Sequence, residues 1–351
     1  MKVRLPVRAA ILKRRTYEAP AEGRFGKIRL DFNENTTGCS EAVRKAIARL
    51  SGKELAMYPE YEKRTRTIAK YFGVKLDEIV LTNGGDDALR VFFDTFVEPG
   101  SRVLICEPTF PMYRYYAEIA GARVETLRYR KWMEFPEKAT IAALRKKPRV
   151  FFLANPNNPT GTLVGLDVIE RLLRTAASTV VVLDEAYSDF CAVSGVKLIQ
   201  QYPQLFLAKT FSKAAGLAGL RLGAVIAKKE SLALVRRALP PFPVNVAALV
   251  AAEAAIQEGT AIRKYVRGVK KLRSRLEEEL DARAVYAYPS EGNFVLADFG
   301  KSGPALFKKL KKRGILVRDR SHDIGPGFAR ISIGTKAELQ ELLRLMDESG
   351  W

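Results

Sequence analysis

Cysteine is scarce in this sequence, and its scarcity bears on both compartment and chemistry. The chain contains three cysteines, Cys39, Cys106 and Cys191. Because their number is odd and their spacing matches no metal or redox motif, they indicate a reducing interior. We therefore expect a cytoplasmic protein without a bound metal.

Long apolar stretches are missing as well. No run of about 18 apolar residues occurs, so we expect no membrane span. Residues 1–15 are basic, but their apolar stretches are too short and too interrupted for a signal peptide.

Acidic residues are outnumbered by basic ones, which gives a formal net charge of +20. Such an excess is typical of proteins that bind nucleic acid. Here Lys and Arg are spread along the chain, the densest run (308–313) follows a helical pattern, and neither zinc-finger spacing nor an RNA-recognition signature is present. We expect no nucleic-acid partner, and a positive field that concentrates phosphorylated and carboxylated small molecules.

What the sequence does contain is an alternation of short apolar runs and longer helical patterns between residues 78 and 230. Continuous apolar runs rich in β-branched residues suit strands that are buried on both faces, and helical segments between them, such as 169–177, suit right-handed crossover connections. These features predict an α/β domain with a mostly parallel sheet. The expected strands are 79–81, 103–105, 124–127, 150–153, 180–183, 205–207 and 223–226.

The pattern changes after the proline-rich segment 240–243. A long helical region, 244–280, precedes several short strands and a closing helix at 336–347, which indicates a second, α+β domain. The strands expected in it are 293–296, 315–317 and 329–333. We predict an N-terminal arm (1–30), a large domain (31–240) and a small C-terminal domain (241–351).

Polar motifs follow several of the expected strands, and ligands of a parallel sheet bind beyond the carboxyl ends of its strands. Residues 83–87 read NGGDD and lead into a helical pattern, an arrangement that lets backbone N–H groups approach a phosphate. Residues 155–161 read NPNNPTG, and their two X-Pro steps make a stiff loop that can hold an amide in place.

The strand 180–183 ends in Asp184 and Glu185. A carboxylate at the end of a buried apolar strand is costly unless a cation meets it, and a protonated pyridine nitrogen is one such cation. A Walker B motif also ends an apolar strand in Asp-Glu, but it requires an upstream Walker A loop. The near match at 300–302 (GKS) lacks the first glycine and lies downstream, so the nucleotide-hydrolase interpretation fails.

Beyond the strand 205–207 stand Thr210, Ser212 and Lys213, with Arg221 eight residues further on in a glycine-rich turn. A lone lysine in such a loop is better explained as a solvated surface residue. This lysine, however, has two hydroxyls and a guanidinium nearby in sequence, all of which bind phosphate. A desolvated lysine near other cations becomes nucleophilic toward an aldehyde.

Four motifs together make the chain resemble the fold-type-I, class I/II aminotransferases, which use pyridoxal 5′-phosphate (PLP), and within them the histidinol-phosphate aminotransferases. The resemblance extends from residue 31 to residue 335. Its motifs are NPNNPTG (155–161), DEAY (184–187), TFSK (210–213) and GLAGLRLG (216–223).

This resemblance implies roles for individual residues. Lys213 would hold the cofactor covalently and move protons during turnover, and Asp184 would pair with the ring N–H. Asn158 and Tyr187 would hydrogen-bond the ring 3-oxygen, and Phe110 would stack on the ring where relatives often have Tyr. The cofactor phosphate would be held by Gly85, Asp86, Thr210, Ser212, Arg221 and Tyr58, the last reaching the neighbouring subunit of a homodimer.

On the substrate side, the resemblance implies that Arg318 and Arg330 bind an anionic group, with Tyr17 beside them. It implies ping-pong transamination between L-histidinol phosphate and 2-oxoglutarate in histidine biosynthesis. Threonine-phosphate decarboxylation and a broad aromatic or aspartate-type transamination remain open, because arginine binds phosphate and carboxylate equally well. NGGDD in place of the usual N-G-[ST]-D-E, and Phe242 where some relatives have Tyr, leave the substrate open too. The one histidine, His322, is expected in an exposed loop.

Overall fold

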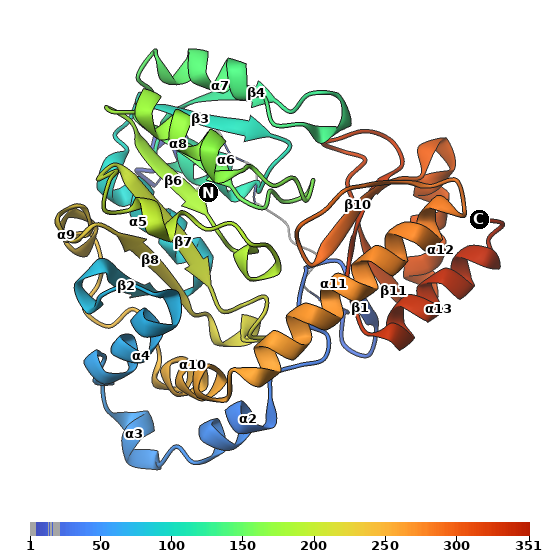
Figure 1. The fold of residues 1–351 in the computed structure, drawn as a ribbon, viewed down its shortest axis with the longest axis horizontal. Helices are drawn as coiled ribbons and strands as arrows, with labels where there is room; N and C mark the ends of the chain where they lie inside the picture. The colour runs from blue at the N-terminus through green and yellow to red at the C-terminus, as the bar shows by residue number, and fades with distance from the viewer. Residues whose placement is uncertain (1–4, 13, 15, 17–21) are drawn as a thin grey trace.

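A computed structural model describes residues 5–12, 14, 16 and 22–351, which form two lobes, each built around one sheet (Figure 1). The first lobe holds seven strands in the order β2-β8-β7-β6-β5-β3-β4. β8 is antiparallel to both neighbours and the other pairs are parallel, which confirms the predicted mostly parallel sheet. In chain order the strands are β2 (Ile79–Thr82), β3 (Arg102–Glu107), β4 (Arg123–Arg128), β5 (Val150–Ala154), β6 (Val180–Asp184), β7 (Leu205–Thr210) and β8 (Gly223–Ala227).

Alternate residues of this sheet supply two separate cores. In β3, Val103 and Ile105 pack into one cluster of buried side chains, whereas Leu104 packs into the other. All residues of β2, β5 and β8 are buried, as expected of strands covered on both faces. Helices α5 (Gly84–Phe96), α6 (Met112–Ile119) and α9 (Lys229–Arg236) cover one face, and α4 (Glu62–Phe72), α7 (Glu137–Leu144) and α8 (Leu166–Thr175) cover the other.

The second lobe holds five strands in the order β1-β11-β12-β10-β9, and the expected strands of the C-terminal part are β10, β11 and β12. The three-residue strands β1 and β9 were not expected. β1 comes from the last residues of the predicted arm and pairs in parallel with β11; the domain boundaries at residues 30 and 240 stay a prediction. The elements of this lobe are β1 (Ile28–Leu30), β9 (Tyr286–Tyr288), β10 (Phe294–Asp298), β11 (Ile315–Asp319), β12 (Phe328–Ser332), α12 (Gly303–Lys312) and α13 (Lys336–Asp347).

The helical region expected over 244–280 is two helices, α10 (Val246–Glu258) and α11 (Thr260–Asp281), separated by Gly259. Gly259 has a φ of +52°, which L side chains rarely adopt, and its N–H donates to the Ala255 carbonyl at the end of α10. α10 packs on α2 (Glu41–Ala48) and α4 beside the first lobe, whereas α11 runs across to the second (Figure 1).

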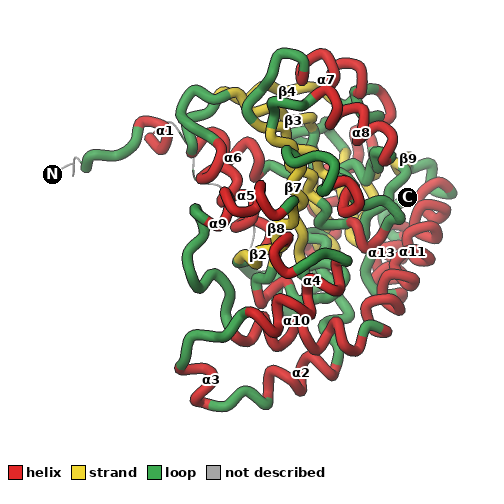
Figure 2. The backbone as a smooth tube through the Cα atoms, turned by 60° about the vertical axis from the view of Figure 1, so that its left-hand side comes forward, coloured by secondary structure: helices red, strands yellow, loops and turns green. Residues whose placement is uncertain are grey.

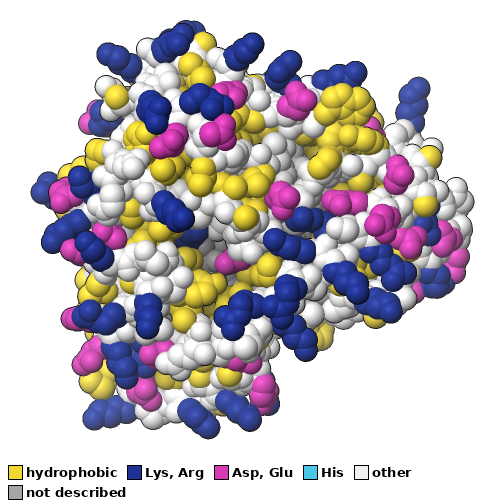
Figure 3. Space-filling view, viewed as in Figure 1, with side chains coloured by type: hydrophobic (Ala, Val, Ile, Leu, Met, Phe, Trp, Pro, Cys, Tyr) yellow, Lys and Arg dark blue, Asp and Glu magenta, His cyan; other side chains and the backbone are white. Residues whose placement is uncertain are grey.

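On the face that Figure 3 draws, Lys and Arg side chains occur over both lobes. The short helix α1 (Ala9–Leu12) lies at the edge of the molecule beside α6 (Figure 2). Among the described residues, no helix has the length and apolar character needed to cross a membrane. Within the same residues, no cluster of His, Cys, Asp and Glu is suited to hold a metal ion.

Candidate active site

A cavity of about 480 Å³ opens between the two lobes, beyond the carboxyl ends of β5, β6 and β7. Most of the predicted site residues line it, although they come from distant parts of the chain. These are Gly85, Asp86, Phe110, Asn158, Asp184, Tyr187, Thr210, Ser212, Lys213, Arg221, Arg318 and Arg330. Their assigned roles stay predictions, but the expectation that they share one space agrees with the geometry.

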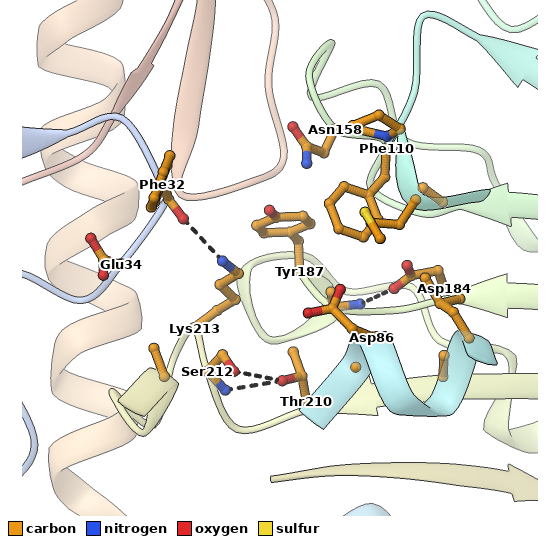
Figure 4. Close-up of a pocket in the computed structure, with 18 of the residues that line it drawn as sticks. Phe32, Glu34, Asp86, Phe110, Asn158, Asp184, Tyr187, Thr210, Ser212 and Lys213 are labelled. Carbon is orange, nitrogen blue, oxygen red and sulfur yellow. Dashed lines mark hydrogen bonds between the residues drawn. The ribbon is translucent and has the colours of Figure 1, made fainter. Parts of the chain in front are cut away.

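Lys213 extends into this cavity from the turn after β7 (Figure 4). Its Nζ donates a hydrogen bond to the Phe32 carbonyl oxygen at 3.0 Å and lies 5.7 Å from the centre of the Tyr187 ring. The Phe32 ring in turn lies near two guanidiniums, at 3.9 Å from Arg24 and 5.8 Å from Arg318. The segment after β1 therefore places a backbone acceptor on the amine and an aromatic ring beside cationic groups.

One end of the cavity is suited to bind a phosphate. Gly85 and Asp86 lie in the first turn of α5, where free backbone N–H groups and the helix dipole favour an anion. Thr210 Oγ1 accepts from the Ser212 N–H at 3.1 Å and lies 3.0 Å from the Ser212 hydroxyl. Arg221 donates to the Asp86 carboxylate at 2.9 Å, which keeps its guanidinium at the same helix end.

Two glycines allow β8 and the start of α5 to approach each other closely. A Cβ built at Gly84 would lie 2.6 Å from Arg221 Nη2, the end of a flexible side chain. A Cβ built at Gly223 would lie 2.6 Å from the carbonyl carbon and oxygen of Gly84. Because those are backbone atoms, the second contact cannot be relieved without moving β8 or the helix terminus.

We expect Gly223→Ala to lower the free energy of unfolding by about 1–3 kcal/mol, the usual cost of overpacking. Urea unfolding of the purified variant measures this change. Gly219→Ala is the matched control, because a Cβ at Gly219 would have no neighbour within 4 Å. Equal stabilities for the two variants would contradict the close approach of β8 and α5.

The cavity is also lined by the carboxylate of Asp184, the last residue of β6. Asp184 Oδ2 accepts from the Tyr113 hydroxyl at 2.7 Å, and Oδ1 accepts from the Ala186 N–H at 3.0 Å. Burial raises the pKa of Asp184, although both hydrogen bonds act in the opposite direction. Ionised Asp184 is therefore costly here, and a cationic ligand group placed against it would offset that cost.

Aromatic and amide side chains occupy the middle of the site, and Figure 4 shows Tyr187 among them. The Phe110 ring meets the Tyr113 ring edge-on at 5.8 Å, so one of its faces is available to the cavity that it lines. The Tyr187 hydroxyl accepts a hydrogen bond from Asn33 Nδ2 at 2.9 Å. Asn158 Oδ1 accepts from Arg330 Nη1 at 2.5 Å.

Three arginines of the second lobe form one wall of the cavity: Arg318, Arg320 and Arg330. Arg330 is buried, and its Nη2 donates to the carbonyl of Asp31. Burial lowers the pKa of Arg330 to about 10, and the positive charges of Arg320 and Arg318 act in the same direction. A multiply charged anion at this wall would relieve the repulsion among the guanidiniums.

Of the predicted site residues that the structure describes, one lies away from the cavity. Tyr58 is 78% exposed and stacks on Phe242 at 4.2 Å, away from the residues that line the cavity. Tyr17 lies outside the described residues. His322 has a 66% exposed side chain, as expected of a loop histidine, and lies 3.7 Å from Asp323.

Three contacts of the site were missed at the level of sequence: Phe32 with Lys213, Asn33 with Tyr187, and Tyr113 with Asp184. Phe32 and Asn33 belong to the segment DFNEN (31–35), where the resemblance begins. Their place in that segment was the sequence signal that could have pointed to the site. The contact of Tyr113 with Asp184 was not predicted, because an aromatic residue at helical spacing usually indicates core packing.

The cavity therefore matches a ligand with a phosphate at one end, a flat ring beside Phe110 and a cationic ring atom facing Asp184. A carbonyl on that ligand would lie near the amine of Lys213, and an anionic second substrate would meet the arginine wall. Lysine amines react with carbonyl groups in this way when they are held in desolvated sites.

Comparison with known proteins is consistent with this geometry. Residues 26–345 match the family model for aminotransferase class I and II. The chain is 34% identical over 328 residues to the histidinol-phosphate aminotransferase of Geobacillus sp. (strain WCH70), covering 92% of this chain and 89% of that protein.

Solved structures give the same picture. A putative histidinol-phosphate aminotransferase from Erwinia carotovora atroseptica is similar with a TM-score of 0.87 and 28% identity, over 92% of this chain and 95% of that one. The L-threonine-O-3-phosphate decarboxylase of Porphyromonas gingivalis is similar with a TM-score of 0.77 and 27% identity, over 92% and 98%. At 24% identity, a Sinorhizobium meliloti enzyme solved with pyridoxal-5′-phosphate shares the fold, with a TM-score of 0.90 over 98% and 97%.

Proposed function

The chain belongs to the aminotransferase class I and II family, and from that membership we propose that it transfers the amino group of L-histidinol phosphate to 2-oxoglutarate, in a ping-pong reaction of histidine biosynthesis. The observation that carries the choice of substrate is the wall of three arginines, Arg318, Arg320 and Arg330, in the cavity that holds Lys213. Arginine binds phosphate and carboxylate with the same geometry, but a phosphate brings close to two negative charges to this wall where a carboxylate brings one.

Pyridoxal 5′-phosphate is the cofactor of this family, and the residues present fit it. Its phosphate suits the start of α5 with Thr210, Ser212 and Arg221, and its ring nitrogen suits the carboxylate of Asp184. The cofactor supplies a reactive carbonyl and a ring that withdraws electrons. The chain supplies the rest, which is binding, orientation and proton transfer.

In this proposal Lys213 Nζ removes the proton from the substrate α-carbon, acting as the general base. Asp184 would favour a positive charge on the ring nitrogen, and Tyr113 holds that carboxylate in place through its hydroxyl. Asn158 and Tyr187 would hold the ring 3-oxygen. Arg330 donates a hydrogen bond to Asn158, so an anion bound by Arg330 would lie near a residue that would hold the cofactor ring.

Arginine also explains how one site accepts two substrates in turn. Its planar guanidinium binds phosphate and carboxylate with the same paired geometry. The phosphate of histidinol phosphate and a carboxylate of glutamate can therefore use Arg318 and Arg330 in turn. A ping-pong reaction permits this shared use, since the two substrates never occupy the site together.

We expect Arg318→Leu to reduce kcat/KM for histidinol phosphate, mainly through KM. Loss of hydrogen bonds to a charged group costs about 1.5–3 kcal/mol, which corresponds to about 10- to 150-fold. Steady-state kinetics with both substrates measure the change. Arg128→Leu, at an exposed position at the end of β4, is the matched control. A loss at Arg318 no larger than the control's would remove this residue from the substrate site.

The proposed function is tested by half-reactions of the PLP-loaded enzyme without a keto acid. L-Histidinol phosphate, L-threonine phosphate, L-phenylalanine and L-glutamate are offered one at a time, and the visible band of the cofactor is followed. Rapid loss of the band with histidinol phosphate and glutamate supports the proposal. Loss with phenylalanine or glutamate alone leaves a transaminase with another donor, and carbon dioxide release from threonine phosphate with the band retained makes the enzyme a decarboxylase.

The proposed enzyme acts as a cytoplasmic homodimer on small molecules, without nucleic acid. The support for a dimer is Tyr58, which is aromatic, largely exposed and stacked on the half-exposed Phe242. A second subunit would cover both rings. Analytical ultracentrifugation of the holoenzyme measures the mass directly, and a monomer at micromolar concentration would contradict this part of the proposal.

A further inference from the structure

Asn33 is a buried polar residue near the cavity with hydrogen bonds from both its backbone and its side chain. It follows β1, is fully buried and has a φ of +54°, a left-handed conformation that asparagine adopts more readily than most residues. Its carbonyl oxygen accepts from Asn293 Nδ2 at 3.0 Å, and Asn293 precedes β10 in the second lobe. The backbone of Asn33 is therefore held in place independently of the contacts of its side chain.

The orientation of the Asn33 side-chain amide follows from Ser332. The Ser332 hydroxyl oxygen accepts from the Asn33 backbone N–H at 2.8 Å, and its one proton goes to Asn33 Oδ1 at 2.9 Å. An NH₂ group cannot accept that proton, so the amide oxygen must face Ser332. The amide nitrogen must then face the other way, where the Tyr187 hydroxyl lies at 2.9 Å.

This orientation decides what Tyr187 can do. An NH₂ group only donates, so the Tyr187 hydroxyl oxygen is an acceptor in its contact with Asn33. The single proton of that hydroxyl must point elsewhere, and Tyr187 lines the cavity beside Lys213. We propose that Asn33 and Ser332 are positioning residues, which orient the Tyr187 hydroxyl so that it donates its hydrogen bond to the bound cofactor. This inference rests on the proposed function only in that PLP occupies the cavity.

The hydrogen bond donated by Tyr187 has a chemical consequence for the cofactor. A hydrogen bond donated to an anionic ring oxygen withdraws electron density from it, and a neighbouring protonated nitrogen then releases its proton at a lower pH. Asn33, Ser332 and Tyr187 are all buried, which strengthens the hydrogen bonds between them. The charged and titratable groups that face Tyr187 are Lys213 after β7, Arg330 of β12, and Asp184 with its partner Tyr113.

The test is a pH titration of the visible cofactor band in the holoenzyme without substrate. Asn33→Asp replaces the donor by a carboxylate, which accepts from Ser332 and Tyr187 alike and so diverts the Tyr187 proton. We expect the apparent pKa of the band to rise by about one unit, a tenfold change in proton affinity. Asn35→Asp makes the same chemical change two residues away, where the side chain contacts Thr37, and is expected to leave the pKa unchanged.

The same substitution in a Tyr187→Phe background separates positioning from simple charge. If Asn33 acts through Tyr187, the two residues are coupled. Most of the rise in the apparent pKa of the cofactor band that Asn33→Asp causes is then lost in the Tyr187→Phe background. An equal rise in both backgrounds would overturn the inference. A purely structural role would lower the melting temperature without producing this coupling.

Ser332→Ala provides a second test of the inference if the Asn33→Asp variant does not fold. It adds no charge and removes the group that orients the amide, so Asn33 can turn its oxygen toward Tyr187. We expect a smaller rise of the band's pKa that disappears in the Tyr187→Phe background, and no rise would overturn the inference. Failure of the wild-type chain to develop a visible band with PLP would instead refute the proposed function, independently of Asn33.

Discussion

Lys213→Ala is expected to lower kcat by about 10²- to 10⁴-fold, because the substitution removes the general base of the proposed reaction. It also removes the amine that holds the cofactor. Borohydride treatment of the wild-type holoenzyme is expected to fix the cofactor to the peptide that contains Lys213, and the variant is expected to lose this fixation. Mass spectrometry of the digested protein and single-turnover kinetics measure the two effects.

The chain offers a demanding control for this prediction in Lys209, four residues earlier. Lys209 also borders the cavity, but its amine donates to Ser188 at 2.9 Å and pairs with the buried carboxylate of Glu185. An amine that is engaged by a carboxylate and a hydroxyl is not free to attack a carbonyl. Cofactor fixed to Lys209 in the variant, or undiminished fixation at any lysine, would show that the site is wrongly assigned.

The second large loss of activity is expected for Asp184→Asn. Removing one partner of a buried charge pair costs about 3–5 kcal/mol, which corresponds to a loss in kcat of roughly 10²-fold to more than 10³-fold. The amide keeps the shape of the side chain, so it can still accept from Tyr113, whose hydroxyl lies 2.7 Å from the carboxylate. Steady-state kinetics and cofactor affinity by equilibrium dialysis measure the effect.

Tyr113→Phe provides the graded comparison. It leaves the Asp184 charge in place and removes one hydrogen bond to it, which is worth about 1.5–3 kcal/mol for a charged acceptor. We therefore expect Tyr113→Phe to weaken kcat less than Asp184→Asn does. If the order were reversed, or if Asp184→Asn kept kcat within tenfold of wild type, the carboxylate would not be the partner of the ring nitrogen.

The parts of the fold that sequence predicted are those with a strong local signal. Buried strands such as 150–153 and 180–183 have apolar residues at every position, and each is followed by a polar motif. Because the carboxyl ends of parallel strands meet at one edge of a sheet, Asn158, Asp184 and Lys213 were expected to lie together, and one cavity holds all three.

The parts that sequence did not predict depend on distant partners. β1 has three residues, too few for any periodicity, and exists because β11 pairs with it. The hydrogen bonds of Asn33 join it to Ser332 and Tyr187, and no local pattern reports such contacts. The break at Gly259 was missed because the helical pattern continues on both sides of one glycine.

The pairing of β1 with β11 also has a consequence for how the protein is made. Residues 28–30 leave the ribosome well before Ile315–Val317, their partners, are synthesised. The first lobe can fold while translation continues, since domains generally fold as units during synthesis. The segment carrying Phe32 and Asn33 has to wait, because its strand has nothing to pair with. The acceptor for the Lys213 amine is thus positioned only once the second lobe forms, as is the arginine wall, so the first lobe alone cannot complete the pocket.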